Sequence, residues 1–301
     1  MNADAVVFII CAHDNPAALK RLVSRLASPW ARVLVHIDKK ADIADFRIQD
    51  ADFIPDGKRV SILWGGSRHM LAVLNCLRHA LQTYPGACRF VMLSAADYPI
   101  KPLGDIRDFL LANEDTDFIR VGRKVVWNGP TPQDHNLKFH IGDIELFNDR
   151  LSPVPKMAAF ARKLAAKIPR RPPRGYVIYH GAMWWALSRK GAETVLRFAD
   201  ENTVFMRWIA RARDRGEHFV QTALKADANT VISQDATRGD ALPATLHGVH
   251  YIDWSAGGPH PKTLGLEDLP ALVQTSALFA RKFHPATSAR VLDALDERIG
   301  R

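Results

Sequence analysis

The sequence has little cysteine and no long apolar run, and each absence argues against a class of protein. Its 301 residues include three cysteines, Cys11, Cys76 and Cys88, which lack pair spacing. We therefore expect reduced core thiols in a cytosolic protein and no disulfide framework. No run approaches the roughly 20 apolar residues of a transmembrane helix. No basic segment precedes the short apolar run near the N-terminus, so we interpret that run as a first strand rather than a signal peptide.

Short motifs of several enzyme classes are also missing. No GxGxxG or GxxxxGK[ST] occurs, so the sequence supports neither a dinucleotide fingerprint nor a P-loop. GxSxG and HExxH are absent as well. The Asp-x-Asp spacings at 50–52 and 115–117 do not follow an apolar strand, so neither pair is expected at the tip of a strand.

The composition is that of an ordinary globular protein with an excess of positive charge. Hydrophobic residues make up 47% and charged residues 24%, and the length allows one large α/β core or two modest domains. The formal net charge of +9 favours an anionic partner: nucleic acid, a membrane surface or a phosphorylated substrate. Because no RNA- or DNA-binding signature is present, we expect no nucleic-acid partner.

Apolar runs alternate with helical patterns through the first part of the chain. Strands are predicted at 5–11, 32–37, 59–63, 90–93 and 118–121, with helices beginning near Asn15, Ser67 and Gly104. This alternation predicts an α/β fold with a mostly parallel sheet that is covered by helices on both faces.

Polar side chains follow four of these strands. They are His13 after the first strand, Asp38 after the second, Trp64 after the third and Asp97 after the central strand. Ligands of open α/β sheets bind beyond the carboxyl ends of the strands. The recurrence of polar side chains after four strands therefore favours a binding cleft. Each has a structural alternative, and Asp97 is equally typical of a turn before a proline. One carboxylate is a poor site for a hard cation, so we expect no catalytic metal.

The second part of the chain contains three further features with open interpretations. Residues 127–140 form a long polar loop, typical of a lid or binding segment. Residues 156–174, from Lys156 to Arg174, predict a basic amphipathic helix with a Pro-Arg tail, either solvated or attached to anionic lipid. Asp214 and Glu217 have the spacing of a capping box, which would give Glu217 a purely structural role.

Eight segments together resemble the core-2/I-branching glycosyltransferase family, glycosyltransferase family 14, which includes xylosyltransferases; the bacterial branch is most similar. They are AHDNPAALKRL at 12–22, HIDKK at 36–40, WGGS at 64–67, SAADYPIKP at 94–102, YHGAMWWALSRKG at 179–191, GEHFVQT at 216–222, YIDW at 251–254 and LFARKF at 278–283. They follow the family order over nearly the whole chain. Each is weak alone, and the ordered set is specific.

The resemblance implies a GT-A-like fold and an inverting, metal-independent transfer of a sugar from a UDP donor to a glycan hydroxyl. Residues 1–301 would form a single domain, with a nucleotide-sugar-binding half at 1–121 and an acceptor-binding and catalytic half at 122–301. N-acetylglucosamine and xylose are the donor sugars expected. By its motif, Glu217 would be the general base and Lys282 would stabilise the UDP diphosphate.

The resemblance also assigns further binding residues. Donor-binding residues would be His13, Asp38, Trp64, Asp97 and Arg281, and acceptor-binding residues would be Trp184 and Trp254. Alternation along a strand predicts that one of Trp184 and Trp185 points inward and one outward.

The sequence departs from the family pattern at three places. The family's second phosphate-binding arginine has no match; His250 stands near its place, with Arg281 or Lys262 as substitutes. Gly216 replaces the usual aspartate before Glu217, and Ala95-Ala96 replaces a commoner glycine-containing turn.

Two functional hypotheses follow. The first is a cytoplasmic enzyme, peripheral on the inner membrane face, that builds bacterial surface polysaccharide on a glycan or lipid-linked glycan acceptor. The second is a noncatalytic nucleotide-sugar or glycan-binding protein with the same fold. Turnover of a UDP-sugar by the wild type and by Glu217→Gln distinguishes them.

Overall fold

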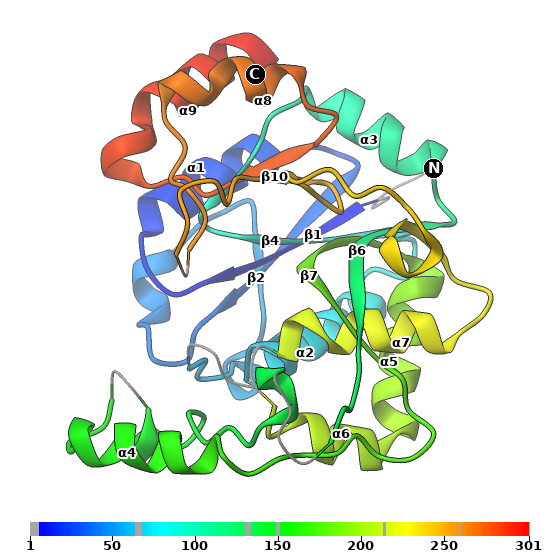
Figure 1. Cartoon of the computed structure of the whole chain (residues 1–301). Helices are drawn as coiled ribbons and strands as arrows, with labels where there is room; N and C mark the ends of the chain where they lie inside the picture. The colour runs from blue at the N-terminus through cyan, green and yellow to red at the C-terminus, as the bar shows by residue number, and fades with distance from the viewer. Residues whose placement is uncertain are drawn as a thin grey trace.

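A seven-stranded sheet lies between two layers of helices in the computed structural model (Figure 1). The structure describes residues 6–63, 68–129, 134–148, 151–212, 215–258 and 260–300. Its strands are β1 (Val6–Ala12), β2 (Ala31–Ile37), β3 (Asp52–Phe53), β4 (Arg89–Ser94), β5 (Asp97–Pro99), β6 (Thr116–Val125), β7 (Ile178–Ser188), β8 (Val231–Asp235), β9 (Leu246–His247), β10 (His250–Ile252) and β11 (Phe279–Arg281). Its α-helices are α1 (Pro16–Leu26), α2 (Arg68–Thr83), α3 (Leu103–Ala112), α4 (Pro155–Ala165), α5 (Arg189–Glu201), α6 (Thr203–Ile209), α7 (Phe219–Ala226), α8 (Leu269–Gln274) and α9 (Pro285–Ile299).

The main sheet has the strand order β3-β2-β1-β4-β7-β6-β8. Every neighbouring pair is parallel except those of β7, which runs antiparallel to β4 and to β6. The predicted α/β fold with a mostly parallel sheet is confirmed. Strands from both halves of the chain share this sheet, because β6 and β7 continue the order from β4.

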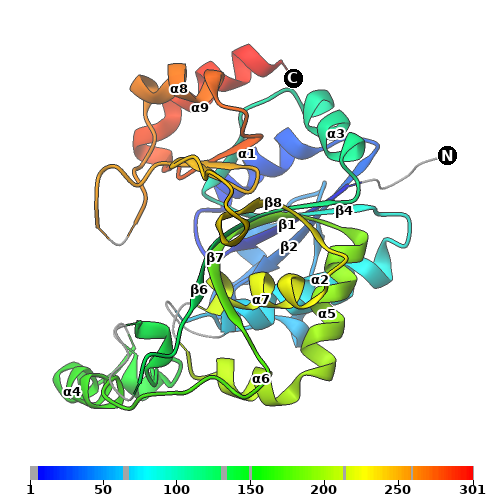
Figure 2. The ribbon, with the colours of Figure 1, turned by 45° about the vertical axis from the view of Figure 1, so that its right-hand side comes forward.

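Alternate side chains of the central strands pack against the two helical layers. Val7 and Ile9 of β1 lie in a core with α2, α5 and α7. Phe8 and Ile10 lie in a second core with α1, α3 and α9. Figures 1 and 2 show these two sets of helices on opposite faces of the sheet. Successive side chains of a strand point to opposite faces of the sheet. Because helices cover both faces here, the central strands need apolar side chains at every position.

A second, four-stranded sheet with the order β5-β11-β10-β9 brings distant parts of the chain to the end of β4. β5 follows β4 after two residues and pairs antiparallel with β11, so that Asp97 lies opposite Arg281. β11 pairs in parallel with β10. The sequence pattern did not predict this sheet, because its strands are only two or three residues long.

The prediction of a strand at 59–63 is wrong. This segment is irregular, and side chains of β2 and of the loop after it bind its backbone in place of a strand ladder. The amide of Val60 donates to His36 Nε2 at 2.9 Å, and the amide of Ile62 donates to Asp38 Oδ2 at 3.0 Å. β3 occupies the edge of the sheet instead.

The predicted helix starts are confirmed where the structure describes them. Asn15 caps α1 by accepting a hydrogen bond from the amide of Ala18 at 3.1 Å, and Pro16 stands at the first helical position. The helix start predicted near Ser67 lies outside the described residues. The segment that begins at Lys156 forms α4 and then continues without helix through its Pro-Arg tail. Among the described residues, no helix is long and apolar enough to cross a bilayer.

Candidate functional site

The ends of β1, β2 and β4 meet at one edge of the main sheet. The register places Cys11 beside His36 on one side and beside Ser94 on the other. The predicted residues His13, Asp38 and Asp97 follow these three ends and are therefore brought to the same edge. His13 is exposed, whereas Asp38 and Asp97 are buried. The prediction for Trp64 lies outside the described residues.

Asp38 fixes the loop that follows β2. Its carboxylate accepts hydrogen bonds from the Lys40 ammonium at 2.8 Å, from the Lys40 amide at 2.9 Å and from the Ile62 amide at 3.0 Å. These bonds hold residues 38–40 against residue 62 at the sheet edge. Asp38 therefore shapes the loop at this edge of the sheet.

Asp97 forms the centre of a second cluster at the end of β4. Its carboxylate accepts hydrogen bonds from the Ser94 amide at 2.6 Å, the Ser94 hydroxyl at 3.1 Å and Arg281 Nη1 at 3.1 Å. Burial raises the pKa of Asp97, and the Arg281 guanidinium and the Ser94 hydrogen bonds oppose that rise. The paired guanidinium and these donors compensate the burial of the carboxylate.

Arg281 and His250 cover the same aromatic side chain. The Arg281 guanidinium lies 3.9 Å from the centre of the Trp184 ring, and the His250 ring centre lies 5.4 Å from it. His250 also stacks on Phe279 at 5.5 Å. Burial lowers the pKa of His250 well below its usual value, so the ring is neutral at pH 7. His250 therefore carries no positive charge near the place of the family's second phosphate-binding arginine, which has no match in this chain.

Lys282 offers a positive charge beside the Asp97 cluster. Arg281 is committed to Asp97, and Lys262 pairs with Asp268 at 2.6 Å. Lys282 is half-buried, and its ammonium forms no hydrogen bond or ion pair with any residue that the structure describes. It directly follows β11, next to the Asp97–Arg281 pair. An anionic ligand at the sheet edge would find an available cation here.

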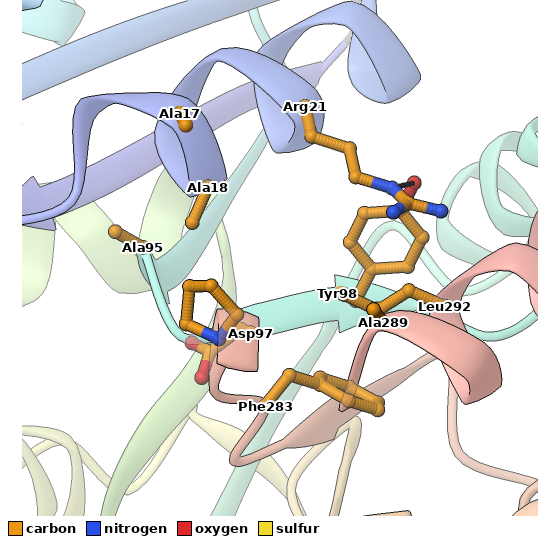
Figure 3. Close-up of a pocket in the computed structure, with 10 residues that line it drawn as sticks. Ala17, Ala18, Arg21, Ala95, Asp97, Tyr98, Phe283, Ala289 and Leu292 are labelled. Atoms are coloured by element: carbon orange, nitrogen blue, oxygen red, sulfur yellow. Dashed lines mark hydrogen bonds between the residues drawn. The ribbon is translucent and has the colours of Figure 1, made fainter. Parts of the chain in front are cut away.

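A small apolar recess of about 180 Å³ lies beside Asp97, between α1 and the start of α9 (Figure 3). Ten residues line it: Ala17, Ala18, Arg21, Ala95, Asp97, Tyr98, Phe283, Pro285, Ala289 and Leu292. Figure 3 shows Arg21 and Tyr98 at one side of the recess, opposite Ala95. Arg21 is held there by Asp293 and Asp296, each at 2.7 Å. The recess is smaller than the pocket of a typical small-molecule ligand, so it would hold only part of a nucleotide sugar.

Glu217 stands at the end of a short 3₁₀ turn, Arg215–Glu217, directly before His218 and α7. Its Oε2 lies 3.3 Å from His180 Nε2, and its side chain is 39% exposed. The His180 ring contacts the His218 ring at 4.9 Å, and His218 Nδ1 lies 3.1 Å from the Tyr179 carbonyl. The carboxylate is thus oriented and still open to solvent. Its predicted capping partner Asp214 lies outside the described residues.

β7 connects the Glu217 cluster with the Asp97 cluster. It carries His180 near its start and Trp184 four residues later, which corresponds to ~13 Å along a strand. Gly181 lies between them, and a Cβ there would come within 1.8 Å of the Arg120 carbonyl oxygen. Only glycine allows β6 and β7 to approach so closely. His180 was not among the predicted site residues, although it lies in the YHGAMWW segment that resembles the family.

The predicted aromatic residues differ in exposure. Trp184 and Trp185 are both buried, so the expectation that one of them points outward is wrong. Trp184 has Arg281 over its ring, and Trp185 packs in the core with α2, α5 and α7. Trp254 is exposed just after β10. The acceptor-binding role of Trp184 and Trp254 stays a prediction.

Comparison with known proteins adds independent information. A model of the family described as "Core-2/I-Branching enzyme" matches residues 6–273. The chain is 25% identical to "Xylosyltransferase oxt" of Drosophila melanogaster over 306 residues, which cover 92% of this chain and 31% of that protein. It is also 25% identical to human "Xylosyltransferase 2" over 307 residues, 97% of this chain and 33% of that protein.

A third relative is closer in size. The chain is 25% identical to the mouse "N-acetyllactosaminide beta-1,6-N-acetylglucosaminyl-transferase" over 312 residues, 98% of this chain and 72% of that protein. By contrast, it spans about a third of the length of the xylosyltransferases that it matches.

Proposed function

Because the chain belongs to the Core-2/I-Branching enzyme family, we propose that it is a glycosyltransferase that moves a sugar from a UDP donor to a hydroxyl of a glycan acceptor. The names of its relatives, xylosyltransferase and β-1,6-N-acetylglucosaminyltransferase, favour xylose or N-acetylglucosamine as the sugar. One observation carries the proposal. The structure holds a partly exposed carboxylate, Glu217, and a cation without a partner among the described residues, Lys282, at the two positions that the family motifs select.

In the proposed reaction Glu217 is the general base. It takes the proton of the acceptor hydroxyl while the oxygen attacks the anomeric carbon from the face opposite UDP. The new glycosidic bond forms as the bond from the anomeric carbon to the diphosphate oxygen breaks, and UDP leaves with the electron pair. The configuration is inverted in this single displacement. The contact with His180 supports the assignment, because it orients the carboxylate without closing it off from solvent.

Lys282 is proposed to stabilise the negative charge that develops on the leaving diphosphate. Arg281 is assigned to the same region, with its guanidinium held by Asp97. We also propose that the transfer needs no divalent metal. In support, Asp97 is the single carboxylate at the end of β4, and its oxygens accept hydrogen bonds from Ser94 and Arg281.

The acceptor is proposed to be a glycan or a lipid-linked glycan of bacterial surface polysaccharide. The exposed Trp254 offers an aromatic face to a sugar ring on the side of the second sheet. The donor would lie at the edge formed by His13, Asp38 and Asp97.

A noncatalytic nucleotide-sugar-binding protein is the second candidate. The neutral, buried His250 favours this second candidate. His250 stands near the place of the family's second phosphate-binding arginine and carries no charge there. In that case UDP would bind and no sugar would be transferred or hydrolysed.

Hydrolysis of a panel of UDP-sugars, with and without EDTA, tests the proposal. We expect one donor to be turned over in EDTA, and we expect Glu217→Gln and Lys282→Ala each to lower kcat by about a hundredfold or more. Glu201→Gln and Lys20→Ala remove the same charges at exposed positions and should leave kcat unchanged. Loss of activity in EDTA would contradict metal independence. UDP binding without turnover of any donor would favour the second candidate.

A further inference from the structure

An arm of the molecule, residues 151–177, contains α4 and then returns along the body to β7, where the Arg170 amide donates to the Leu137 carbonyl at 2.7 Å and the Tyr176 hydroxyl to Asn202 at 2.8 Å. Figures 1 and 2 both show α4 at one extremity of the molecule, away from the main sheet. The arm consists of α4 and the non-helical chain that leads from it into β7. At 11 residues α4 is ~16 Å long, about half of what a bilayer-spanning helix needs.

Large apolar side chains cover the solvent face of this arm. Met157 and Phe160 are each 70% exposed, Leu164 is 55% exposed, and Ile168, which follows the end of α4, is 53% exposed. Met157, Phe160 and Leu164 are spaced by three and four residues, so they lie on one face of α4. The arm also exposes Leu151, Val154 and Val177. Isolated exposed apolar residues are common, whereas a contiguous apolar stripe indicates an interaction site.

Small side chains face the body instead. Ala158 and Ala165 are buried, and they project about a third of a turn away from the apolar stripe. Arg162 holds the helix in this orientation by donating to the Phe147 carbonyl at 2.6 Å. The usual order of an amphipathic surface helix, with its largest apolar side chains in the core, is therefore reversed in α4.

The charge of the arm is of one sign. No aspartate or glutamate occurs at 151–192. Five exposed cations lie in the arm: Lys156, Lys163, Lys167, Arg171 and Arg174. None of the five forms an ion pair with any residue that the structure describes. Helical spacing places Lys156 and Lys163 along one edge of the apolar stripe, where their ammonium groups can reach phosphate while the stripe is buried.

We propose that the arm is an interfacial anchor that binds the surface of an anionic phospholipid bilayer. Met157, Phe160, Leu164 and Ile168 insert at the boundary between headgroups and acyl chains, and the flanking cations contact lipid phosphates. The absence of any acidic side chain argues for a lipid surface, which is uniformly negative, over a protein partner of mixed charge. The inference rests on the arm alone and is independent of the proposed transfer reaction.

The arm is also connected to the site along the chain. Val177 at the end of the arm is three residues before His180, the side chain that contacts Glu217. The anchor is therefore continuous in the chain with the strand that carries the contact to Glu217.

Cosedimentation of the full chain with vesicles tests the proposal. The vesicles are phosphatidylcholine alone, or phosphatidylcholine with about a quarter phosphatidylglycerol. We expect the wild type to bind the anionic vesicles at least about tenfold more tightly, and high salt to weaken this binding. Met157→Ser with Phe160→Ser should weaken it by about tenfold or more, because both side chains leave the acyl boundary. Lys163→Gln with Lys167→Gln should weaken it at low salt only.

Matched variants control for general effects on the surface. Leu71→Ser with Val204→Ser removes exposed apolar side chains outside the arm, and Lys20→Gln with Lys58→Gln removes exposed charges outside it. Both should bind vesicles as the wild type does. Equal wild-type binding to neutral and anionic vesicles overturns the proposal, as does unchanged binding by the Met157/Phe160 variant. A dimer in sedimentation equilibrium that this variant abolishes, without vesicle binding, would assign the stripe to a second copy of the chain.

Discussion

At the scale of single residues, the buried Asp97 and the Arg281 side chain, which is 15% exposed, form an ion pair that connects β5 to β11. The two residues lie opposite each other in the register of β5 and β11, and the Arg281 guanidinium also lies over the Trp184 ring. Each charge is compensated by the other, so the loss of one partner leaves an uncompensated charge in the interior. The pair therefore matters for the stability of the second sheet as well as for the cleft.

Asp97→Asn is expected to lower the free energy of unfolding by about 3–5 kcal/mol, because the Arg281 guanidinium stays buried without its counter-charge. Urea denaturation at pH 7 measures the change. Asp45→Asn, at an exposed position, should change it by less than about 0.5 kcal/mol. Equal stabilities of the two variants would show that the ion pair does not support the fold.

His180 is expected to position Glu217 rather than to touch substrate. His180→Ala removes the 3.3 Å contact with Glu217 Oε2 and should lower kcat by about tenfold with KM for the donor nearly unchanged. His180→Asn keeps a side-chain donor and should restore part of kcat. Steady-state kinetics with the donor identified in the UDP-sugar panel measure both. A loss in both variants that tracks a loss of thermal stability would point to a structural role instead.

At the scale of elements, the start of α1 depends on one residue with two tasks. Asn15 adopts a left-handed conformation, φ 54°, and its side chain caps the helix through the Ala18 amide. Asparagine tolerates this conformation better than most residues, and its amide oxygen satisfies a helix-terminal donor. The residue thereby ends the loop after β1, which carries His13, and begins the helix that lines the recess beside Asp97.

Asn15→Ala should lower the free energy of unfolding by about 2 kcal/mol, since the cap is lost and alanine is strained at positive φ. Asn15→Gly loses the cap without the strain, so its cost should be less than about 1 kcal/mol. Chemical denaturation of the two variants in parallel gives the difference. If alanine cost no more than glycine, the left-handed conformation at this position would be contradicted.

At the scale of the whole molecule, the two sheets carry groups with opposite titration behaviour, the half-buried His247 in β9 and the buried Asp117 in β6. Burial, with the positive charge of Arg120 nearby, lowers the pKa of His247 to about 4. Burial raises the pKa of Asp117 in β6 to about 6, although Ser188 donates hydrogen bonds to it. Between pH 6.5 and 4 the unfolded chain binds a proton at His247 that the folded protein does not, so stability falls as the pH falls. Asp117 acts in the opposite direction as the pH falls from about 6 to about 4.

His247→Gln isolates one of these opposing effects. From pH 7 to about 4.5 the wild type should lose about 2–3 kcal/mol more in the free energy of unfolding than the variant does. Urea denaturation at the two pH values measures this difference. His13→Gln, at an exposed histidine, should behave as the wild type does. Identical pH dependence of His247→Gln and the wild type would contradict the lowered pKa of His247.

Local patterns determined much of the fold on their own. The fully apolar run of β1 and the helix start at Asn15 each depend on neighbours within a few residues, and both are confirmed. The segment at 59–63 was misread because its backbone partners are the side chains of His36 and Asp38, which local periodicity does not reveal. The short strands of the second sheet were missed because they pair across as many as 184 positions.

The sequence by itself determined the fold class, the family and the edge of the sheet where polar residues gather, because these follow from periodicity and from motifs in order. The tertiary structure alone decided how the individual groups are used. It buried His250 in a neutral state, committed Arg281 to Asp97, placed His180 against Glu217 and turned the apolar face of α4 toward solvent. Each of these depends on contacts between residues far apart in the chain, and burial and charge at such contacts are set only when the chain has folded.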